Sequence, residues 1–342
     1  MSFFKLFTND VAIDLGTANT LVYKNNGGII INEPSVVALS KEGRKVVSVG
    51  EKAKEMLGKN PDEVDVIKPL KDGVISDFKV TEIMLSHMIM KSQKNRWLIR
   101  PRVIVCVPSG ITEVEKRAVR DSVLRAGARE VHLVSEPIAA AIGADLPIHK
   151  PYGNMVMDIG GGTSEIAVIS LSHIVVHNSI RVGGDKMDLD IMNYLKKKNN
   201  LMVGIQIAEK IKKEIGSAYP LKQELEMDVR GRDIVTGYPV TIKVTSNEIR
   251  EAISETVATM IDAIKRLFEK TSPELAADIA ERGIVLTGGG ALLKGLDQKI
   301  KEVVDLPVHV VPNPLLCVVK GSGKILDNLE EYREVLLKKL EE

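Results

Sequence analysis

Two short glycine-rich stretches, each preceded by an aspartate, are the residues best suited to chemistry. Residues 15–19 (LGTAN) follow Asp14, and residues 160–163 (GGGT) follow Asp158. Glycine lets a turn approach a phosphate closely and present several backbone N–H groups on one side. Two carboxylates would repel a polyphosphate unless a cation intervened, and Mg²⁺ is the natural cation between carboxylates and phosphates. The two turns therefore predict a magnesium-bound nucleotide held between two lobes.

The two stretches belong to an internal repeat. The segments from Val11 (VAIDLGTANTLVYK) and from Met155 (MVMDIGGGTSEIAVIS) share an apolar strand, Asp, an apolar residue, Gly, a polar turn and a second strand. A single copy is explained well enough as a hairpin turn, but two copies at corresponding places are not. Because the copies lie far apart, they predict two similar α/β lobes facing each other across a cleft rather than a solenoid.

Two further places can contribute to such a site. Residues 286–291 (LTGGGA) follow an expected strand, and their backbone can lie flat against a nucleobase and the α-phosphate, although alone they are also an ordinary strand–helix turn. Glu136 stands at the end of another expected strand, from which a carboxylate can accept a hydrogen bond from water and aim it. It also precedes Pro137 and a helix, where negative charge is favourable, and the two explanations are compatible.

Other motifs for nucleotide, metal or acyl chemistry are incomplete. Residues 321–324 (GSGK) resemble the end of a Walker A loop. However, the motif requires glycine at position 318, which is Val318, and Ser or Thr at position 325, which is Ile325. The sequence has no Rossmann GxGxxG, no GxSxG elbow, and no pair of histidines at ligand spacing on one expected helix. Cys106 and Cys317 lie in separate apolar runs, which predicts buried thiols.

The elements that would position these residues alternate between strands and helices, as in an α/β protein. Strands are expected at 11–17, 20–24, 28–39, 101–110, 132–137, on both sides of the glycine turn in 154–171, and at 283–289. Helices are expected at 79–93, 112–128, 138–146, 185–199, 206–216, 245–271 and, as the last one, 326–340. Thr112 and Glu115 have the spacing of a capping box, which marks the start of the second helix.

The composition agrees with a folded protein of about two domains. Of the 342 residues, 44% are hydrophobic and 27% are charged, with a formal net charge of +1. This balance excludes global disorder, and it lacks the basic excess that indicates nucleic-acid binding. No run approaches the ~18 apolar residues of a membrane span, and the first ten residues do not have the pattern of a secretory signal. An intracellular, reducing compartment is therefore expected.

The few aromatic residues concentrate in two places that suit a membrane surface. Aromatic residues make up 4% of the chain, yet Phe3, Phe4 and Phe7 fall in the first seven positions, and the single tryptophan, Trp97, has arginines on both sides. Rings at the headgroup boundary beside cations are the chemistry of an interfacial anchor. Either segment can instead pack on the protein itself. Two such segments in an aromatic-poor chain favour membrane contact, with Leu98 beside Trp97 as a further anchor.

These segments together resemble the superfamily of actin, the DnaK-type chaperones and the sugar kinases. Residues 14–17 look like its first phosphate motif, residues 158–163 like its second, and residues 287–291 like its adenosine motif. Within the superfamily, nearly the whole chain is similar to the MreB family of bacterial actin-like cell-shape proteins. The runs that carry this resemblance include IDLGTANTLVY, NEPSVVA, LVSEPIAAAIGADLPI, MDIGGGTSEIAVISL and ELAADIAERGIVLTGGGALLKGL.

The resemblance implies an actin-like fold, that is, a duplicated ribonuclease H-like α/β architecture with two lobes of two subdomains each around a nucleotide cleft. By position, the subdomains would be IA (8–32, 78–144 and 316–342), IB (33–77), IIA (145–180 and 242–315) and IIB (181–241). It also implies a slow ATPase that polymerises into paired protofilaments and organises cell shape and cell-wall synthesis from the cytoplasmic, inner face of the cell membrane. The implied partners are copies of itself, the inner membrane surface and membrane morphogenesis proteins, but no nucleic acid.

The resemblance also assigns roles to individual residues. Asp14 and Asp158 would hold Mg²⁺ through water, and Glu136 would orient the attacking water with the help of Thr163. The residues that would hold ATP are Thr17, Ala18 and Asn19 at the β- and γ-phosphates, Gly160, Gly161 and Gly162 from the other lobe, Glu209 and Lys212 at the ribose and base, and Gly288, Gly289, Gly290 and Ala291 at the adenosine. Two alternatives on the same fold are a small-molecule kinase, which would need an inserted acceptor pocket, and a chaperone-type ATPase, which would need a C-terminal substrate domain.

Overall fold

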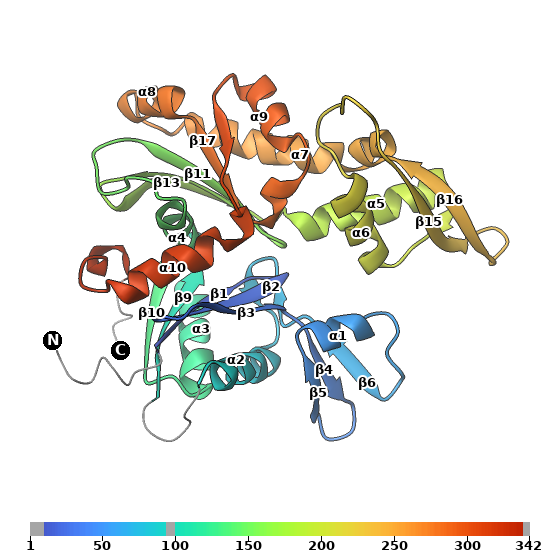
Figure 1. Ribbon diagram of the computed structural model, residues 1–342, viewed down its shortest axis with the longest axis horizontal. Coiled ribbons are helices and arrows are strands. Elements are labelled where there is room, and N and C mark those ends of the chain that lie inside the picture. The colour runs from blue at the N-terminus through green and yellow to red at the C-terminus, as the bar shows by residue number, and fades with distance from the viewer. Residues whose placement is uncertain (1–9, 94–99, 338–342) are drawn as a thin grey trace.

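The computed structural model describes residues 10–93 and 100–337, and it has two lobes, each built on a five-stranded sheet (Figure 1). The first lobe has the strand order β10-β9-β1-β2-β3. Its strands are β1 (Val11–Leu15), β2 (Asn19–Lys24), β3 (Gly28–Pro34), β9 (Arg102–Val107) and β10 (Glu130–Ser135). Helices α2 (Phe78–Ser92) and α3 (Glu113–Arg125) cover one face, and α4 (Glu136–Gly143) and α10 (Cys317–Asp327) cover the other.

Alternation along β1 explains why this sheet is covered on both faces. Val11, Ile13 and Leu15 pack in one core with α2 and α3, whereas Ala12 packs in another with α4 and α10. Since successive residues of a strand point to opposite faces, Asp14 shares the face of Ala12. The end of β1 therefore directs its carboxylate toward the space between the two lobes.

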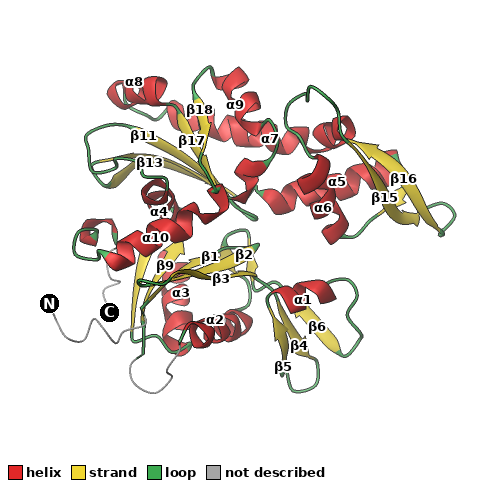
Figure 2. Cartoon of the chain, viewed as in Figure 1, coloured by secondary structure: helices red, strands yellow, loops and turns green. Residues whose placement is uncertain are grey.

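The second lobe repeats this plan with the strand order β13-β12-β11-β17-β18. Its strands are β11 (Asn154–Ile159), β12 (Ser164–Ser170), β13 (His173–Ile180), β17 (Ile284–Thr287) and β18 (Val308–Val310). Helices α7 (Ser246–Phe268), α8 (Pro273–Arg282) and α9 (Leu296–Val304) share a core with one face. Val156, Ala167 and Ile169 on the other face pack with α4, so α4 and α10 lie between the two sheets (Figure 2).

Each lobe carries a smaller addition. In the first, strands β4 (Val37–Ser40), β5 (Val46–Val49) and β6 (Val64–Ile67) form a sheet that packs with α1 (Glu51–Met56) around a small core of its own. The hairpin of β7 (Leu70–Lys71) and β8 (Val74–Ile75) leads from there to α2. In the second, strands β14 (Leu201–Met202), β15 (Glu226–Asp233) and β16 (Pro239–Thr245) lie beside α5 (Gly184–Lys198) and α6 (Ile205–Ile215), whose apolar residues join the core of the second lobe.

The duplicated, two-lobed α/β architecture expected from the repeat is confirmed. β1 pairs antiparallel with β2 and parallel with β9, just as β11 pairs with β12 and β17. The subdomain boundaries stay a prediction: β3 runs to Pro34, past the boundary expected at 32, and β16 spans the one expected at 241. Within the described residues no helix has the length and apolar character needed to cross a bilayer.

Two expected elements are wrong in their bounds. The strand expected at 28–39 is two strands in different sheets, because the chain turns after Pro34, where the Ser35 N–H donates to the Ala18 carbonyl at 3.0 Å. The helix expected at 326–340 lies earlier, as α10, and a short 3-10 helix at Arg333–Val335 follows it, while residues 338–340 fall outside the described range. Glycine disfavours helices, but in α10 a Cβ on Gly321 would lie 1.8 Å from the Ala139 carbonyl oxygen, so close packing against α4 requires it.

Candidate active site between the lobes

The turns of the two sheets meet at one cavity of about 390 Å³, a volume in the range of small-ligand sites. Most of the predicted site residues line it, namely Asp14, Thr17, Ala18, Asn19, Glu136, Asp158, Gly160, Gly161, Gly162, Thr163, Glu209, Lys212, Gly288, Gly289 and Gly290. Ala291 does not, because its side chain is buried in the core of the second lobe. The predicted membrane anchors Phe3, Phe4, Trp97 and Leu98 lie outside the described residues.

The two glycine-rich turns touch each other. A Cβ on Gly161 would lie 2.7 Å from the Cβ of Ala18, and a Cβ on Gly162 would lie 2.8 Å from Thr17 Oγ1. Both distances are shorter than van der Waals contact allows, so only glycine permits this approach. The glycines of the second turn therefore set how closely the two lobes meet at this cavity.

The start of α5 supports the second turn, a contact that sequence reasoning missed. The N–H of Gly184 donates to the Gly160 carbonyl at 3.0 Å, and the N–H of Asp185 donates to the Gly161 carbonyl at 2.8 Å. N–H groups in the first turn of a helix have no partner inside the helix, so these bonds satisfy them and fix the turn at once. The signal in the sequence is the Gly-Gly pair just before the expected helix. The structure shows why glycine is required there, because a Cβ on Gly183 would lie 2.6 Å from the Gly161 carbonyl oxygen.

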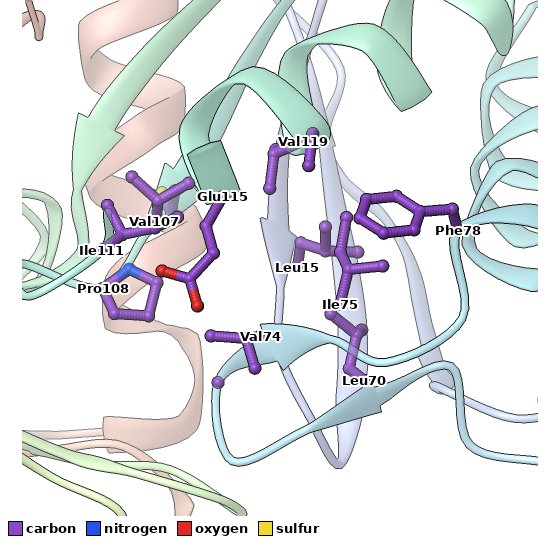
Figure 3. A pocket seen from close by; sticks show the side chains of 13 residues that line it. Leu15, Leu70, Val74, Ile75, Phe78, Val107, Pro108, Ile111, Glu115 and Val119 are labelled. Carbon is purple, nitrogen blue, oxygen red and sulfur yellow. The ribbon is translucent and has the colours of Figure 1, made fainter. Parts of the chain in front are cut away.

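The tip of the β7–β8 hairpin is a second missed contact. Gly73 has a φ of +78°, which favours glycine, and its N–H donates to Thr17 Oγ1 at 3.2 Å. A Cβ there would lie 2.7 Å from Thr163 Cγ2, so the hairpin touches both turns. Side chains that include Leu15 and Pro108 line an apolar pocket beside the hairpin (Figure 3). The small addition of the first lobe therefore reaches the cavity through this hairpin.

Asp14 and Asp158 occupy equivalent positions in the two sheets, but their neighbours differ. Asp14 lies opposite Cys106 of β9, and Asp158 lies opposite Thr287 of β17, whose hydroxyl donates to Asp158 Oδ1 at 2.7 Å. Burial raises the pKa of Asp14 to about 8, with a further contribution from the charge of Asp158. Burial also raises the pKa of Asp158, but the hydrogen bond from Thr287 opposes this rise and the pKa is about 6.

Glu136, whose side chain is buried, adds a third carboxyl group to the lining of the cavity. Burial raises its pKa well above the ordinary range, and the charges of Glu165, Asp14 and Asp158 raise it further. Carboxylates that repel one another in this way are relieved by protons or by a cation, and oxygen donors are those that Mg²⁺ prefers. Asp14 and Asp158 therefore fit a magnesium ion. No cluster of three or more His, Cys, Asp or Glu that could hold a metal occurs among the described residues, so water or phosphate oxygens would complete its shell.

Glu209 and Lys212 lie three residues apart on α6, at another part of the cavity wall. The Nζ of Lys212 is 2.8 Å from Asp188 Oδ1. Glu209 Oε2 is 2.8 Å from the Nζ of Lys54 on α1, which links the small additions of the two lobes. Burial alone would raise the pKa of Glu209, but hydrogen bonds from Lys213 and Lys54 outweigh it and hold this pKa at about 2.

Sequence relatives cover nearly the whole chain. The profile of the family described as MreB/Mbl protein matches residues 8–334. The chain is 50% identical over 332 residues to the cell shape-determining protein MreB of Escherichia coli K12, which covers 96% of each chain. It is 48% identical over 326 residues to the cell shape-determining protein Mbl of Bacillus subtilis 168, which covers 95% of this chain and 98% of that protein.

Solved structures share the fold. MreB5 of Spiroplasma citri bound to ADP has 35% sequence identity and a TM-score of 0.91, covering 96% of this chain and 99% of that one. The same protein bound to AMPPNP has 36% identity and a TM-score of 0.91, covering 96% and 98%. A MamK double helical filament has a TM-score of 0.79 at 23% identity over 93% of this chain and 99% of that one, which supports the fold alone. The actin-like fold is thereby confirmed, and the kinase and chaperone alternatives lose their support. The chain belongs to the MreB/Mbl family of cell shape-determining proteins.

Proposed function

We propose that this chain binds ATP with Mg²⁺ in the cavity between its lobes, hydrolyses it there, and assembles with copies of itself into filaments that organise cell shape and cell-wall synthesis. One observation carries the proposal: two duplicated turns touch at a single cavity that three carboxyl groups, those of Asp14, Glu136 and Asp158, also line. The MreB5 relative bound to ADP or AMPPNP supports an adenine nucleotide as the ligand. The MamK filament is an assembly built from another protein with this fold.

The walls of the cavity suggest how ATP would be divided among them. Backbone N–H groups of the two turns would bind the phosphates, the glycines of the third turn would face the adenosine with Ala291 packed behind them, and α6 would meet the ribose and base. The residues with these roles are Thr17, Ala18 and Asn19, then Gly160, Gly161 and Gly162, then Gly288, Gly289 and Gly290, and finally Glu209 and Lys212. Backbone N–H groups suit this task because they bind phosphate without needing to be charged.

Hydrolysis would depend on placing water and balancing charge. Asp14 and Asp158 would hold Mg²⁺ through water, and the ion would neutralise the phosphates. Phosphoryl transfer to water needs in-line placement more than covalent help. Glu136 lies on the cavity wall, where a carboxyl oxygen can accept a hydrogen bond from water and orient it, and the hydroxyl of Thr163 can steady the same water.

Purified chain with and without ATP and Mg²⁺ tests the proposal by calorimetry, phosphate release and electron microscopy. We expect binding heat, slow phosphate release and filaments. Glu136→Ala should retain the binding heat and slow phosphate release by ~100-fold, since a positioned acid–base group contributes on that order. Absence of both binding heat and a rise in melting temperature with ATP and Mg²⁺ would overturn the proposal. Unchanged turnover in Glu136→Ala would remove that residue from the mechanism.

We also propose that the filaments lie on the inner membrane surface, in the cytoplasm, where membrane morphogenesis proteins would meet them. The aromatic and aliphatic residues Phe3, Phe4, Trp97 and Leu98 would supply weak anchors, which polymerisation multiplies. Trp97→Ser combined with Leu98→Ser should reduce the co-pelleting of filaments with anionic liposomes. Equal pelleting at matched polymer concentration would refute the role of this segment.

A further inference from the structure

Glu165 is a fully buried carboxylate to which the roles proposed above assign no task. It lies on β12, opposite Asp158 of β11, and none of its surface is exposed. A charged group is costly to bury unless hydrogen bonds satisfy it, so its partners show what the fold gains from it.

The two oxygens of this carboxylate face different lobes. Oε2 accepts hydrogen bonds from the backbone N–H of Ser109 at 3.1 Å and from the Ser109 hydroxyl. Oε1 accepts a hydrogen bond from the hydroxyl of Ser179. Ser109 follows β9 of the first lobe, whereas Ser179 lies on β13, next to β12 in the second lobe. One oxygen of the Glu165 carboxylate therefore accepts a hydrogen bond from its own sheet, and the other oxygen accepts hydrogen bonds from the opposite lobe.

The residues around Ser109 bring this contact close to the phosphate turns. A Cβ on Gly110 would lie 3.4 Å from the Cβ of Ser179, so the segment after β9 packs directly on β13. A Cβ on Gly73 would lie between Thr163 Cγ2 and Pro108 Cγ, at 2.7 Å and 3.3 Å. Pro108 itself points into the pocket beside the β7–β8 hairpin (Figure 3).

Glu165 is also placed to act on Thr163. Thr163 immediately precedes β12 and Glu165 is the second residue of that strand. Residues two positions apart in extended chain point to the same side. Any movement of β12 relative to Ser109 would therefore move the Thr163 hydroxyl relative to the first lobe, where Glu136 lies.

We propose that Glu165 is a positioning residue that ties the start of β12 to the first lobe through Ser109, and so sets the geometry in which Thr163 and Glu136 act on the same water. The proposal rests on the hydrolytic function proposed above. It predicts a defect in turnover rather than in nucleotide binding, because Glu165 does not line the cavity.

Two matched substitutions test whether the hydrogen bonds between Glu165 and Ser109 position Thr163; these bonds are called the tie below. Ser109→Ala removes a hydroxyl bond between the lobes, and Ser179→Ala removes the corresponding bond within the second lobe. We expect Ser109→Ala to lower kcat for phosphate release by about 10-fold with KM for ATP within about twofold, because misplaced reacting groups lose rate before they lose binding. Ser179→Ala should stay within about twofold of the unaltered chain in both constants. Glu165→Gln should behave like Ser179→Ala, since its carbonyl can still accept both bonds from Ser109 while its amide donates to Ser179.

Hydrogen exchange of the amides at 109–111, expressed as protection factors, gives a readout that needs no hydrolysis. Protection should fall by about 10-fold in Ser109→Ala and change little in Ser179→Ala, because an amide is protected only while its hydrogen bond stays closed. Equal kcat values or equal protection in the two variants would overturn the tie and leave Glu165 a purely structural group. If the unaltered chain hydrolyses no ATP, the proposed function fails, and the exchange comparison alone decides the tie.

Discussion

The two glycine-rich turns, one after Asp14 and one after Asp158, share one backbone plan but are supported differently. The first turn is held by Ser35, whose N–H donates to the Ala18 carbonyl at 3.0 Å and whose hydroxyl donates to the Gly16 carbonyl at 2.5 Å. The second turn is held by two backbone N–H groups at the start of α5. The carboxylate of the second lobe also has a hydroxyl donor in Thr287, whereas Cys106 stands at the matching place in the first. Duplication therefore preserved the geometry of the strands, while the supports and the electrostatics of the two halves diverged.

The largest expected effect comes from filling the contact between the turns. A Cβ on Gly162 would lie 2.8 Å from Thr17 Oγ1 and 3.0 Å from the Cα of Asp72, so Gly162→Ala must push the two lobes apart. We expect ATP affinity measured by calorimetry to fall by about 100-fold, because the two halves of the proposed phosphate site no longer converge. In Gly160→Ala the nearest atom is 3.3 Å from the new Cβ, and this control should lose about 10-fold at most. Equal losses would show that the contact between the turns does not control binding.

Asp14 and Asp158 should affect the stability of the protein over different pH ranges. An unfolded Asp loses its proton near pH 3.8, whereas folded Asp14 keeps its proton to about pH 8 and Asp158 to about pH 6. The folded state therefore binds more protons between these limits, and the free energy of unfolding of the nucleotide-free protein falls as pH rises. Asp14→Asn should remove about 1.4 kcal/mol per pH unit of that fall between pH 4 and 8. Asp158→Asn should remove it only between pH 4 and 6.

Urea unfolding at a series of pH values measures both effects. The contrast between the two asparagine variants is its own control, since each carboxyl is removed by the same chemical change. Identical pH profiles for Asp14→Asn and Asp158→Asn would contradict the difference between the two halves.

Changing the residue opposite each aspartate should change the pKa of that aspartate. Cys106→Thr would offer Asp14 the hydroxyl that Thr287 offers Asp158, so the pKa of Asp14 should fall by about one unit, worth about 1.4 kcal/mol. Thr287→Val should raise the pKa of Asp158 by a similar amount. The same urea series reports the change at Asp14 as a shift in the pH at which stability stops falling, and the change at Asp158 as a shift in the lower pH at which the fall becomes less steep. If Cys106→Thr leaves the first pH unchanged while Thr287→Val moves the second, a feature other than the missing hydroxyl sets the difference.

The smallest effect is expected at the edge of the cavity, where the small additions of the two lobes meet. Lys54 bonds Glu209 through its side chain, and its carbonyl accepts a hydrogen bond from Gln206 at 2.6 Å. Both charged side chains are about one-quarter exposed, so the ion pair is worth well under 1 kcal/mol. Lys54→Ala should speed release of a fluorescent ATP analogue by about two- to threefold, and less at high salt. The exposed Lys52 of α1 provides the control, and equal acceleration in Lys52→Ala would exclude a specific role for the pair.

Local patterns predicted much of this fold and of the candidate site. The paired turns were evident in the sequence, and the Thr112 capping box formed as expected. The helix over Gly321 was missed because its glycines disfavour a helix locally and are required only by the packing of α4. Contacts such as Gly73 with Thr17 and Glu165 with Ser109 join segments more than fifty residues apart, and neither segment has a pattern that points to the other. The sequence therefore indicated which residues surround the cavity, but not which contacts fix the positions of the two lobes relative to each other.

Between the two sheets, α4 and α10 meet with backbone against backbone at Gly321 and Ala139. Helices separated by long side chains can slide when those side chains change rotamer, but at this contact no side chain separates the two backbones. We therefore expect each lobe to rotate about this point as a rigid body, with the distance at the pivot held constant. A change that begins at a bound phosphate would then be transmitted to the next subunit of a filament as a twist of one lobe against the other rather than as a stretch.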